Sequence, residues 1–161
     1  MMPYEPVLDV MRRTMSNLEF VQRHATEGGP FEVTQLINSF LGALAHPWEN
    51  MSGELKRIEV RQAEKYGWPS LHKERSTDRD PSSLGDLIRR LRNGVAHGNL
   101  TFLPDGRGQI SALRIVNKDQ KGHRTWGTIL SIADMRCFLD HFVDLVEAIA
   151  RGDRNATSQV A

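Results

Sequence analysis

Apolar residues three and four positions apart recur along most of the chain and predict a mainly helical protein. This spacing is found in five segments: residues 4–24, 31–45, 52–66, 83–97 and a long segment that begins at 131. The segment 31–45 carries apolar residues on more than one stripe, which is typical of a central helix. The segment 52–66 is more polar, and Ser52 is expected to cap it. The pattern therefore predicts a helical bundle.

Two serines mark the starts of the last two predicted helices. Ser83 is expected to cap the helix that runs to about His97. Ser131 and Asp134 show the capping-box pattern of a serine followed three residues later by an acid. These local signals place both helix starts within a residue or so.

The residues between these two helices have the alternation and the turn residues of short strands. Residues 110–117 and 124–130 flank the turn Asp-Gln-Lys-Gly-His and together predict a hairpin, and residues 101–103 lead into the turn Pro-Asp-Gly-Arg-Gly. Residues 69–82, rich in charge and turn formers, predict either a mobile excursion, such as a lid, or a disordered segment, and their place between two helices of one domain favours the mobile excursion. The predicted fold class is mainly α, a helical bundle with a short β-hairpin insertion before the C-terminal helix.

The composition indicates one domain, long enough to bury a single core. The chain has 161 residues, of which 39% are hydrophobic and 25% charged, and its net charge is +1. We expect one domain over residues 1–151 and a polar tail over 152–161. A net charge this small gives no overall attraction to nucleic acid, so a basic site has to be local. Residues 56–92 supply a local bias, with ten Lys and Arg against six acidic residues.

Several functional classes are disfavoured by what the sequence lacks. Cys137 is the only cysteine, which favours a reducing cytoplasm, and inside a predicted helix it is expected to be a packed thiol. The first ten residues lack the basic and apolar regions of a signal peptide. No apolar run approaches the ~20 residues of a membrane span, so no membrane partner is expected. The histidines have no metal-ligand spacing, so neither a metal nor another cofactor is expected.

The fourth predicted helix ends in Arg-Asn-Gly-Val-Ala-His-Gly, although it has just built an apolar face. At about 100° per residue, that face is narrow and consists of Leu84, Leu87, Ile88, Leu91 and Val95. Asn93 and His97 lie opposite it, one turn apart, with Arg90 close by. Arg92 lies roughly 140° round the helix from His97 and about 7.5 Å along its axis. Either the helix distorts at Gly94, or a second copy of the helix completes the site.

His97 allows two interpretations. A histidine on a solvated helix face is usually idle. This one stands where Gly98 is expected to cap the helix, and the helix dipole there favours a protonated imidazole, which suits proton transfer near neutral pH. Gly94 costs about 0.5–1 kcal/mol relative to alanine inside a helix. A glycine there makes sense if another backbone or an RNA strand must come close.

Residues 92–97, Arg-Asn-Gly-Val-Ala-His, resemble the Arg-Asn-x-x-x-His signature of the HEPN superfamily. Members of that superfamily are small helical domains, many of them metal-independent endoribonucleases. The sequence from Glu32 to Glu49 is similar to a branch of small stand-alone bacterial and plasmid-borne members. The resemblance covers most of the chain. It implies an HEPN-like bundle that dimerises with its two motifs facing one another across a cleft, and RNA cleavage at the joint site.

On this resemblance the catalytic residues are Arg92, Asn93 and His97. RNA carries its own nucleophile, the 2′-OH, so the protein has to align it, move protons and stabilise the charged phosphorane. His97 is expected to transfer a proton, Arg92 to bind phosphate oxygens, and Asn93 to position the phosphate or His97. Arg89 and Arg90, a basic cluster beside the motif, are expected to contact RNA phosphates.

The expected partners are a second copy of the chain, RNA and an antitoxin such as a nucleotidyltransferase, for a protein that acts as a toxin or in phage defence. One alternative is a non-catalytic HEPN-like module that binds RNA, a nucleotide or a protein. Another is a structural dimerisation domain whose motif only stabilises the interface. The intact Arg92, Asn93 and His97 favour the enzyme, because a pure binder needs no proton-transfer group at a helix terminus.

Overall fold

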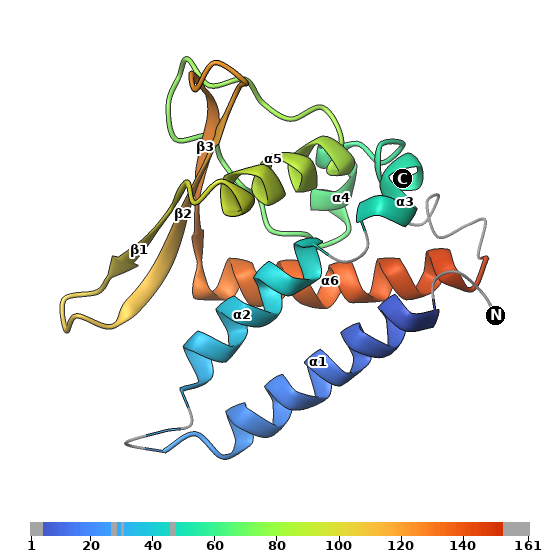
Figure 1. Ribbon diagram of the computed structural model, residues 1–161, viewed down its shortest axis with the longest axis vertical. Coiled ribbons are helices and arrows are strands. Elements are labelled where there is room, and N and C mark those ends of the chain that lie inside the picture. The colour runs from blue at the N-terminus through green and yellow to red at the C-terminus, as the bar shows by residue number, and fades with distance from the viewer. Residues whose placement is uncertain (1–4, 27–28, 30, 46–47, 153–161) are drawn as a thin grey trace.

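The computed structural model describes residues 5–26, 29, 31–45 and 48–152 (Figure 1). The predicted tail, apart from residue 152, lies outside them. Over the described residues the chain forms six helices and three strands: α1 (Glu5–Arg23), α2 (Glu32–Ala45), α3 (Trp48–Leu55), α4 (Val60–Lys65), α5 (Leu84–Ala96), β1 (Leu100–Pro104), β2 (Ile110–Lys118), β3 (Arg124–Ser131) and α6 (Ile132–Ala150). The mainly α class is confirmed.

The helices form a bundle with the sheet at one end. Helices α1, α2 and α6 pack against one another, and α5 packs between α2 and strand β2 (Figure 1). The three strands form an antiparallel sheet of order β1-β2-β3, in which Ile115 pairs with Leu100 on one side and Thr128 on the other. The insertion between α5 and α6 is therefore confirmed, and the short strand-like run at residues 101–103 forms β1 beside the predicted hairpin.

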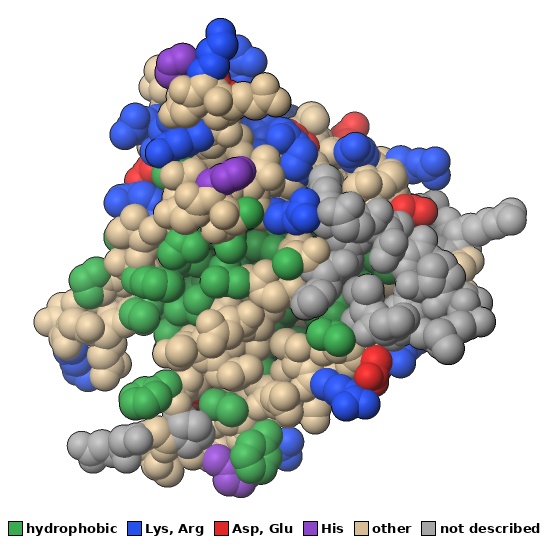
Figure 2. Space-filling model, in the orientation of Figure 1, with side chains coloured by type: hydrophobic (Ala, Val, Ile, Leu, Met, Phe, Trp, Pro, Cys, Tyr) green, Lys and Arg blue, Asp and Glu red, His purple; other side chains and the backbone are tan. Residues whose placement is uncertain are grey.

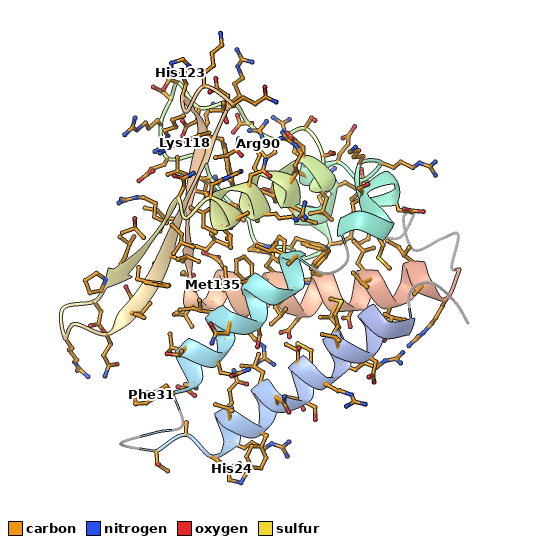
Figure 3. The ribbon with its side chains drawn as sticks, in the orientation of Figure 1. His24, Phe31, Arg90, Lys118, His123 and Met135 are labelled. Atoms are coloured by element: carbon orange, nitrogen blue, oxygen red, sulfur yellow. The ribbon has the colours of Figure 1, made fainter. Side chains whose placement is uncertain are left out.

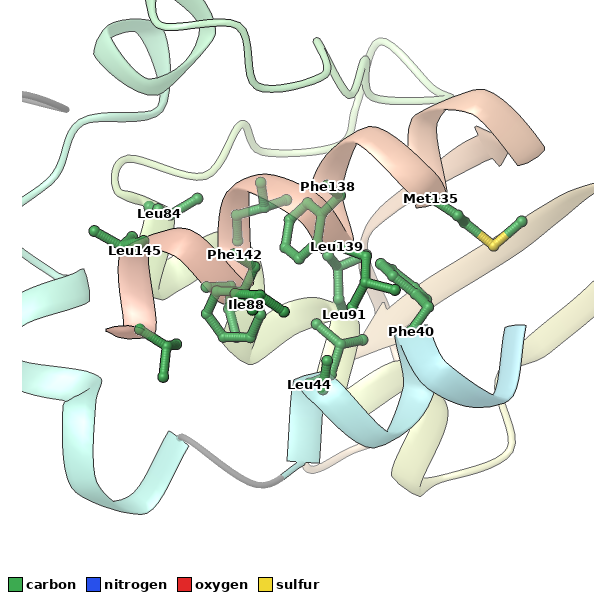
Figure 4. Packing of buried hydrophobic residues seen from close by; sticks show 14 of the residues in the cluster. Phe40, Leu44, Leu84, Ile88, Leu91, Met135, Phe138, Leu139, Phe142 and Leu145 are labelled. Carbon is green, nitrogen blue, oxygen red and sulfur yellow. The ribbon is translucent and has the colours of Figure 1, made fainter. Parts of the chain in front are cut away.

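The core lies where α6 meets α2 and α5; most of it is aliphatic, with a cluster of aromatic side chains among the leucines (Figure 4). Phe138 packs edge-on against Phe40 with ring centroids 5.4 Å apart, and Trp68 packs edge-on against Phe138 at 5.2 Å. A fully buried phenylalanine contributes about 3–5 kcal/mol relative to alanine. This core fixes α5, because Ile88 and Leu91 on its apolar face are fully buried.

Local signals at both ends define α5. The Ser83 side chain accepts a hydrogen bond from the Asp86 backbone N–H at 3.1 Å, as the cap prediction required. At the other end, Gly98 adopts φ +67°, and its N–H donates to the carbonyl of Val95 at 3.0 Å. The Asn99 N–H donates to the carbonyl of Gly94 at 2.7 Å. These two bonds make a Schellman motif, which ends the helix and leaves His97 exposed at its C-cap.

The prediction of one helix over residues 52–66 is wrong. The segment is broken into α3 and α4, and Ser52 lies inside α3 rather than at a cap. The break arises because the backbone at residues 58–59 bonds to the chain entering α5. The Leu84 N–H donates to the Ile58 carbonyl at 2.7 Å, and Glu59 forms an isolated bridge with Ser83. Ile58 is fully buried at this junction, so its long-range contact overrides helix propensity.

The prediction that residues 69–82 are mobile is also wrong, because this segment is bonded along β3. The Glu74 N–H donates to the Gly127 carbonyl at 2.8 Å, and the Thr128 hydroxyl donates to the His72 carbonyl at 2.7 Å. The Arg124 guanidinium forms ion pairs with Asp78 at 2.7 Å and with Glu74 at 3.0 Å. The segment thereby covers the edge of β3 that is not paired with β2, which protects that edge from pairing with other chains.

Asp78 is expected to make the fold sensitive to acid. The hydrogen bond from Arg124 lowers the pKa of the buried Asp78 carboxylate, although burial acts in the opposite direction. Such a carboxylate stabilises the fold fully above its unfolded pKa, about 3.9, and the stabilisation is lost as the pH falls through the folded pKa. The free energy of unfolding should therefore fall below about pH 4. Asp78→Asn should reduce this fall and cost about 1 kcal/mol at neutral pH, because Glu74 remains on Arg124.

Urea unfolding of wild type and Asp78→Asn, at neutral pH and again below pH 4, measures both effects. Asp144→Asn is a matched control, because it removes an exposed carboxylate of α6 that forms no ion pair within the described residues. It should leave the free energy of unfolding at neutral pH unchanged. The assignment to Asp78 is contradicted if Asp78→Asn keeps the full acid sensitivity of wild type.

Candidate active site

Asn93 and His97 line one pocket at the C-terminal end of α5. The pocket has a volume of about 470 Å³ and lies between the helix end and the turn that joins β2 to β3. Its other lining residues are Asn99, Lys118, Asp119, Gln120 and Gly122. Two of the three predicted catalytic residues therefore share a surface pocket, as their spacing of one helical turn predicts.

The turn between β2 and β3 forms the outer wall of this pocket. The carboxylate of Asp119 accepts hydrogen bonds from the backbone N–H groups of Lys121 at 2.9 Å and His123 at 2.8 Å. The backbone hydrogen bond from His123 is the main cause of the lowered pKa of Asp119. Gly122 adopts φ +82°, which a glycine tolerates in such a turn. The wall is thus held by the turn's own bonds.

Arg92, the third predicted catalytic residue, does not line this pocket. The helix runs unbroken from Leu84 to Ala96, so a distortion at Gly94 does not bring Arg92 round to His97. The spacing along a regular helix keeps the two side chains roughly 140° apart. Arg92 is half-buried and already has an interaction within the protein. Of the two explanations derived from the sequence, the distortion at Gly94 is wrong, and a second copy of the helix stays a prediction.

The other two arginines of the motif helix are engaged within the chain. Arg89 forms an ion pair with Asp86 at 2.7 Å, and Arg90 forms another with the same carboxylate at 2.7 Å. Burial opposes ionisation of Asp86, but these arginines lower its pKa. Arg90 also donates to the Arg79 carbonyl and lies over the ring of Trp126, 5.9 Å from its centroid. Phosphate contact by Arg89 and Arg90 stays a prediction, and the more exposed Arg89 is the better placed of the two.

Gly94 is explained by the strand that packs on α5. A Cβ atom at this position would lie 2.9 Å from the carbonyl oxygen of Val116 and would also clash with the side chain of Ile115. The backbone of β2 therefore lies directly against the last turns of the motif helix. Of the two explanations offered for this glycine, a second backbone that comes close is confirmed. This contact sets the position of the β2–β3 turn relative to His97.

Basic side chains gather around the pocket. Figure 2 shows Lys and Arg concentrated over the end of the molecule formed by the sheet and residues 69–82. Figure 3 shows that Lys118 and His123 extend from this end, with Arg90 nearby. Lys118 and Lys121 are exposed, and within the described residues neither forms an ion pair. Such a local basic surface suits a polyanion.

Asn99, Lys118 and Gln120 were missed in the sequence. They lie beyond the motif, in segments that the sequence marks only as strand ends and turns. A hairpin directly after a candidate catalytic helix is the one signal that could have pointed to them. The sequence does not show, however, that this hairpin folds back over the end of α5.

Three other features in the described residues would point to a different function: a metal site, a membrane-spanning helix or a reactive thiol. Within the described residues, no group of three or more His, Cys, Asp or Glu side chains is arranged to hold a metal ion. No described helix is both long enough and apolar enough to cross a membrane. The Cys137 thiol is half-buried and donates to the Gly67 carbonyl at 3.2 Å, and burial raises its pKa, all of which fits a packed thiol rather than a nucleophile.

Most of the chain matches the model of a known protein family. A family model described as HEPN pEK499 p136 matches residues 1–151. Neither the curated proteins nor the solved structures contain a match. The matched range includes the motif helix, the sheet and all of α6.

Proposed function

The chain belongs to the HEPN pEK499 p136 family, and on this premise we propose that it is a metal-independent endoribonuclease that acts as a homodimer. The observation that carries the proposal is the pairing of Asn93 and His97 in one open pocket beside a basic surface. HEPN proteins are often ribonucleases or toxins, and the Arg-Asn-x-x-x-His residues are all present in this chain. A role as a toxin or in phage defence, with an antitoxin such as a nucleotidyltransferase, is part of the same proposal.

The reaction uses the 2′-OH of RNA as the nucleophile. The 2′-oxygen bonds to phosphorus, the bond from phosphorus to the 5′-oxygen breaks, and the electron pair leaves with that oxygen. The proton of the 2′-OH is taken up by a base, and the 5′-oxygen receives a proton from an acid. His97 carries one of these two proton transfers. The products are a 2′,3′-cyclic phosphate and a 5′-OH.

Arg92 and Asn93 act on the phosphate. The guanidinium group offers paired N–H donors to the non-bridging oxygens, on which negative charge grows in the phosphorane. The Asn93 amide, one turn from His97, orients the phosphate or the imidazole. Because Arg92 and His97 point to different sides of α5, each site combines His97 of one subunit with Arg92 of the partner subunit. Dimerisation then completes the site.

The test is the incubation of purified protein with RNA in EDTA. We expect RNA to be cut, and we expect the fragments to carry 2′,3′-cyclic phosphate and 5′-OH ends. A substrate with 2′-deoxy residues throughout should stay intact, because it lacks the nucleophile. Equal cleavage of the deoxy substrate, or dependence on a divalent ion, would show that this mechanism is wrong.

A non-catalytic module that binds RNA or a nucleotide is the second candidate. The basic surface around Lys118 and Lys121 favours it, because such a surface serves binding with or without cleavage. Intact RNA in the assay, together with salt-dependent binding of that RNA, would identify this function instead.

A further inference from the structure

We propose that the pocket between the end of α5 and the β2–β3 turn holds an unpaired nucleobase next to the scissile phosphate, and that Asn99 and Gln120 read its edge. The inference rests on the proposed ribonuclease function and adds a substrate preference to it. It concerns residues outside the Arg-Asn-x-x-x-His motif.

The first argument is the set of side-chain amides in the pocket. Asn93, Asn99 and Gln120 all line it, and within the described residues none of these amides is hydrogen-bonded to a protein group. Asn117, beside them in β2, differs, because its amide nitrogen donates to the Thr125 hydroxyl at 2.6 Å. An amide offers two donors and one acceptor, the same kinds of group that line the edges of nucleobases.

The second argument is the balance of charge. Lys118 brings one positive charge to the pocket and Asp119 one negative charge. The C-terminal end of α5 adds a partial negative charge of about half a unit. The groups that line the pocket carry no large excess of positive charge and suit an uncharged polar ligand, whereas the exposed lysines at its rim suit the phosphate. A base therefore fits the pocket, while its phosphate lies at the rim near Lys118 and His97.

The third argument is the rigidity of the backbone that carries these amides. The Asn99 N–H donates to the Gly94 carbonyl at 2.7 Å, and its own carbonyl accepts from the Val116 N–H at 2.9 Å. Gln120 lies in the turn that Asp119 closes. Amides on a fixed backbone lose only side-chain freedom when they bind, which favours selectivity between similar bases.

The size and openness of the site fit this ligand. A volume of about 470 Å³ lies in the range of ~300–1,000 Å³ found for small-molecule pockets. Sequence-specific RNA recognition usually targets unpaired bases, whose edges are free for hydrogen bonds. The pocket therefore suits an unpaired base, whose edge is free to bond with Asn99 and Gln120.

The experiment maps cleavage sites on a pool of random single-stranded RNA for wild type, Asn99→Ala and Gln120→Ala. Wild type should prefer one base beside the cut, and each variant should reduce that preference by roughly tenfold while cutting other sequences at similar rates. Gln109→Ala is the matched control, because Gln109 is exposed in the β1–β2 turn and lines a different pocket. It should keep the wild-type preference.

A second measurement separates this inference from the proposed function. The affinity for short 2′-O-methyl homopolymers of each base, which cannot be cut, should differ between bases for wild type and become even for the two variants. If RNA is never cut but this binding pattern holds, the ribonuclease proposal fails and the base pocket stands. If RNA is cut but neither cutting nor binding depends on Asn99 or Gln120, the base pocket is overturned and the ribonuclease proposal stands.

Discussion

Replacement of His97 by alanine is expected to lower the proposed RNA cleavage by about 10²–10⁴-fold, the usual loss when a positioned proton-transfer group is removed. The imidazole is exposed at the C-cap of α5 and takes no part in the core. The free energy of unfolding should therefore change by less than about 0.5 kcal/mol. Cleavage of a fluorescent RNA in EDTA gives the rate, and urea unfolding gives the stability. A loss of rate without a loss of stability separates catalysis from a structural role.

His24→Ala is the control for this variant. His24 is also exposed and lies at the opposite end of the molecule from Lys118 (Figure 3). The His24→Ala variant should cut RNA at the wild-type rate. Should His97→Ala also keep the wild-type rate, another group must move the proton, and the assignment of His97 would be abandoned.

The same experiment extends to Arg92. Arg92→Ala should slow cleavage strongly, and Arg92→Lys should restore only part of the rate, because an ammonium lacks the paired donors of a guanidinium. Arg92 is half-buried and has an interaction within the protein, so its stability has to be measured beside its rate. A loss that follows stability alone would support the structural dimerisation domain.

Mixed dimers test whether the site is shared between subunits. A dimer of one Arg92→Ala chain and one His97→Ala chain contains one site with both residues intact and one with neither. Two inactive variants should therefore regain activity when they are unfolded and refolded together. If they form mixed dimers without any gain, Arg92 and His97 do not act across the interface.

Much of the fold follows from signals that act within a few residues. The Ser83 cap, the Schellman glycine at 98 and the capping box of Ser131 and Asp134 are all formed as the sequence predicts. Each is a bond between near neighbours in the chain, so the local sequence contains both partners. The ends of α5 and the start of α6 were predictable for that reason.

The wrong predictions involve contacts between distant segments. The break between α3 and α4 depends on the bond between Ile58 and Leu84, and the ordered segment 69–82 depends on β3. Arg124 lies 46 residues beyond Asp78. A charged, turn-rich segment has the same composition whether its charges face water or pair with one half-buried arginine, so composition could not reveal this pairing.

The candidate site likewise has residues that the local sequence predicts and residues that only long-range contacts place. The motif helix showed Arg92, Asn93 and His97 directly, and its period showed that Arg92 and His97 diverge. The pocket wall, with Lys118 and Gln120, depends on the place where β2 meets α5. That contact is a close approach of two backbones, and a single glycine permits it.

Gly94→Ala is therefore expected to destabilise the fold although alanine is the better helix former. The new Cβ would lie 2.9 Å from the Val116 carbonyl oxygen and would clash with Ile115, and a backbone atom cannot move aside cheaply. Overpacking of this kind costs about 1–3 kcal/mol, which exceeds the 0.5–1 kcal/mol that alanine gains in a helix. We expect a net loss of about 1 kcal/mol in urea unfolding.

Gly42→Ala is the matched control, since Gly42 lies inside α2 and a Cβ there meets no atom within 4 Å. It should be neutral or should stabilise the protein by up to about 1 kcal/mol. If both variants gain stability, β2 does not lie against α5 as described. If Gly94→Ala folds but β2 shifts outward, the β2–β3 turn moves away from His97. RNA cleavage should then fall while Asn93 and His97 remain in place, which would show that the glycine of the motif positions the pocket wall.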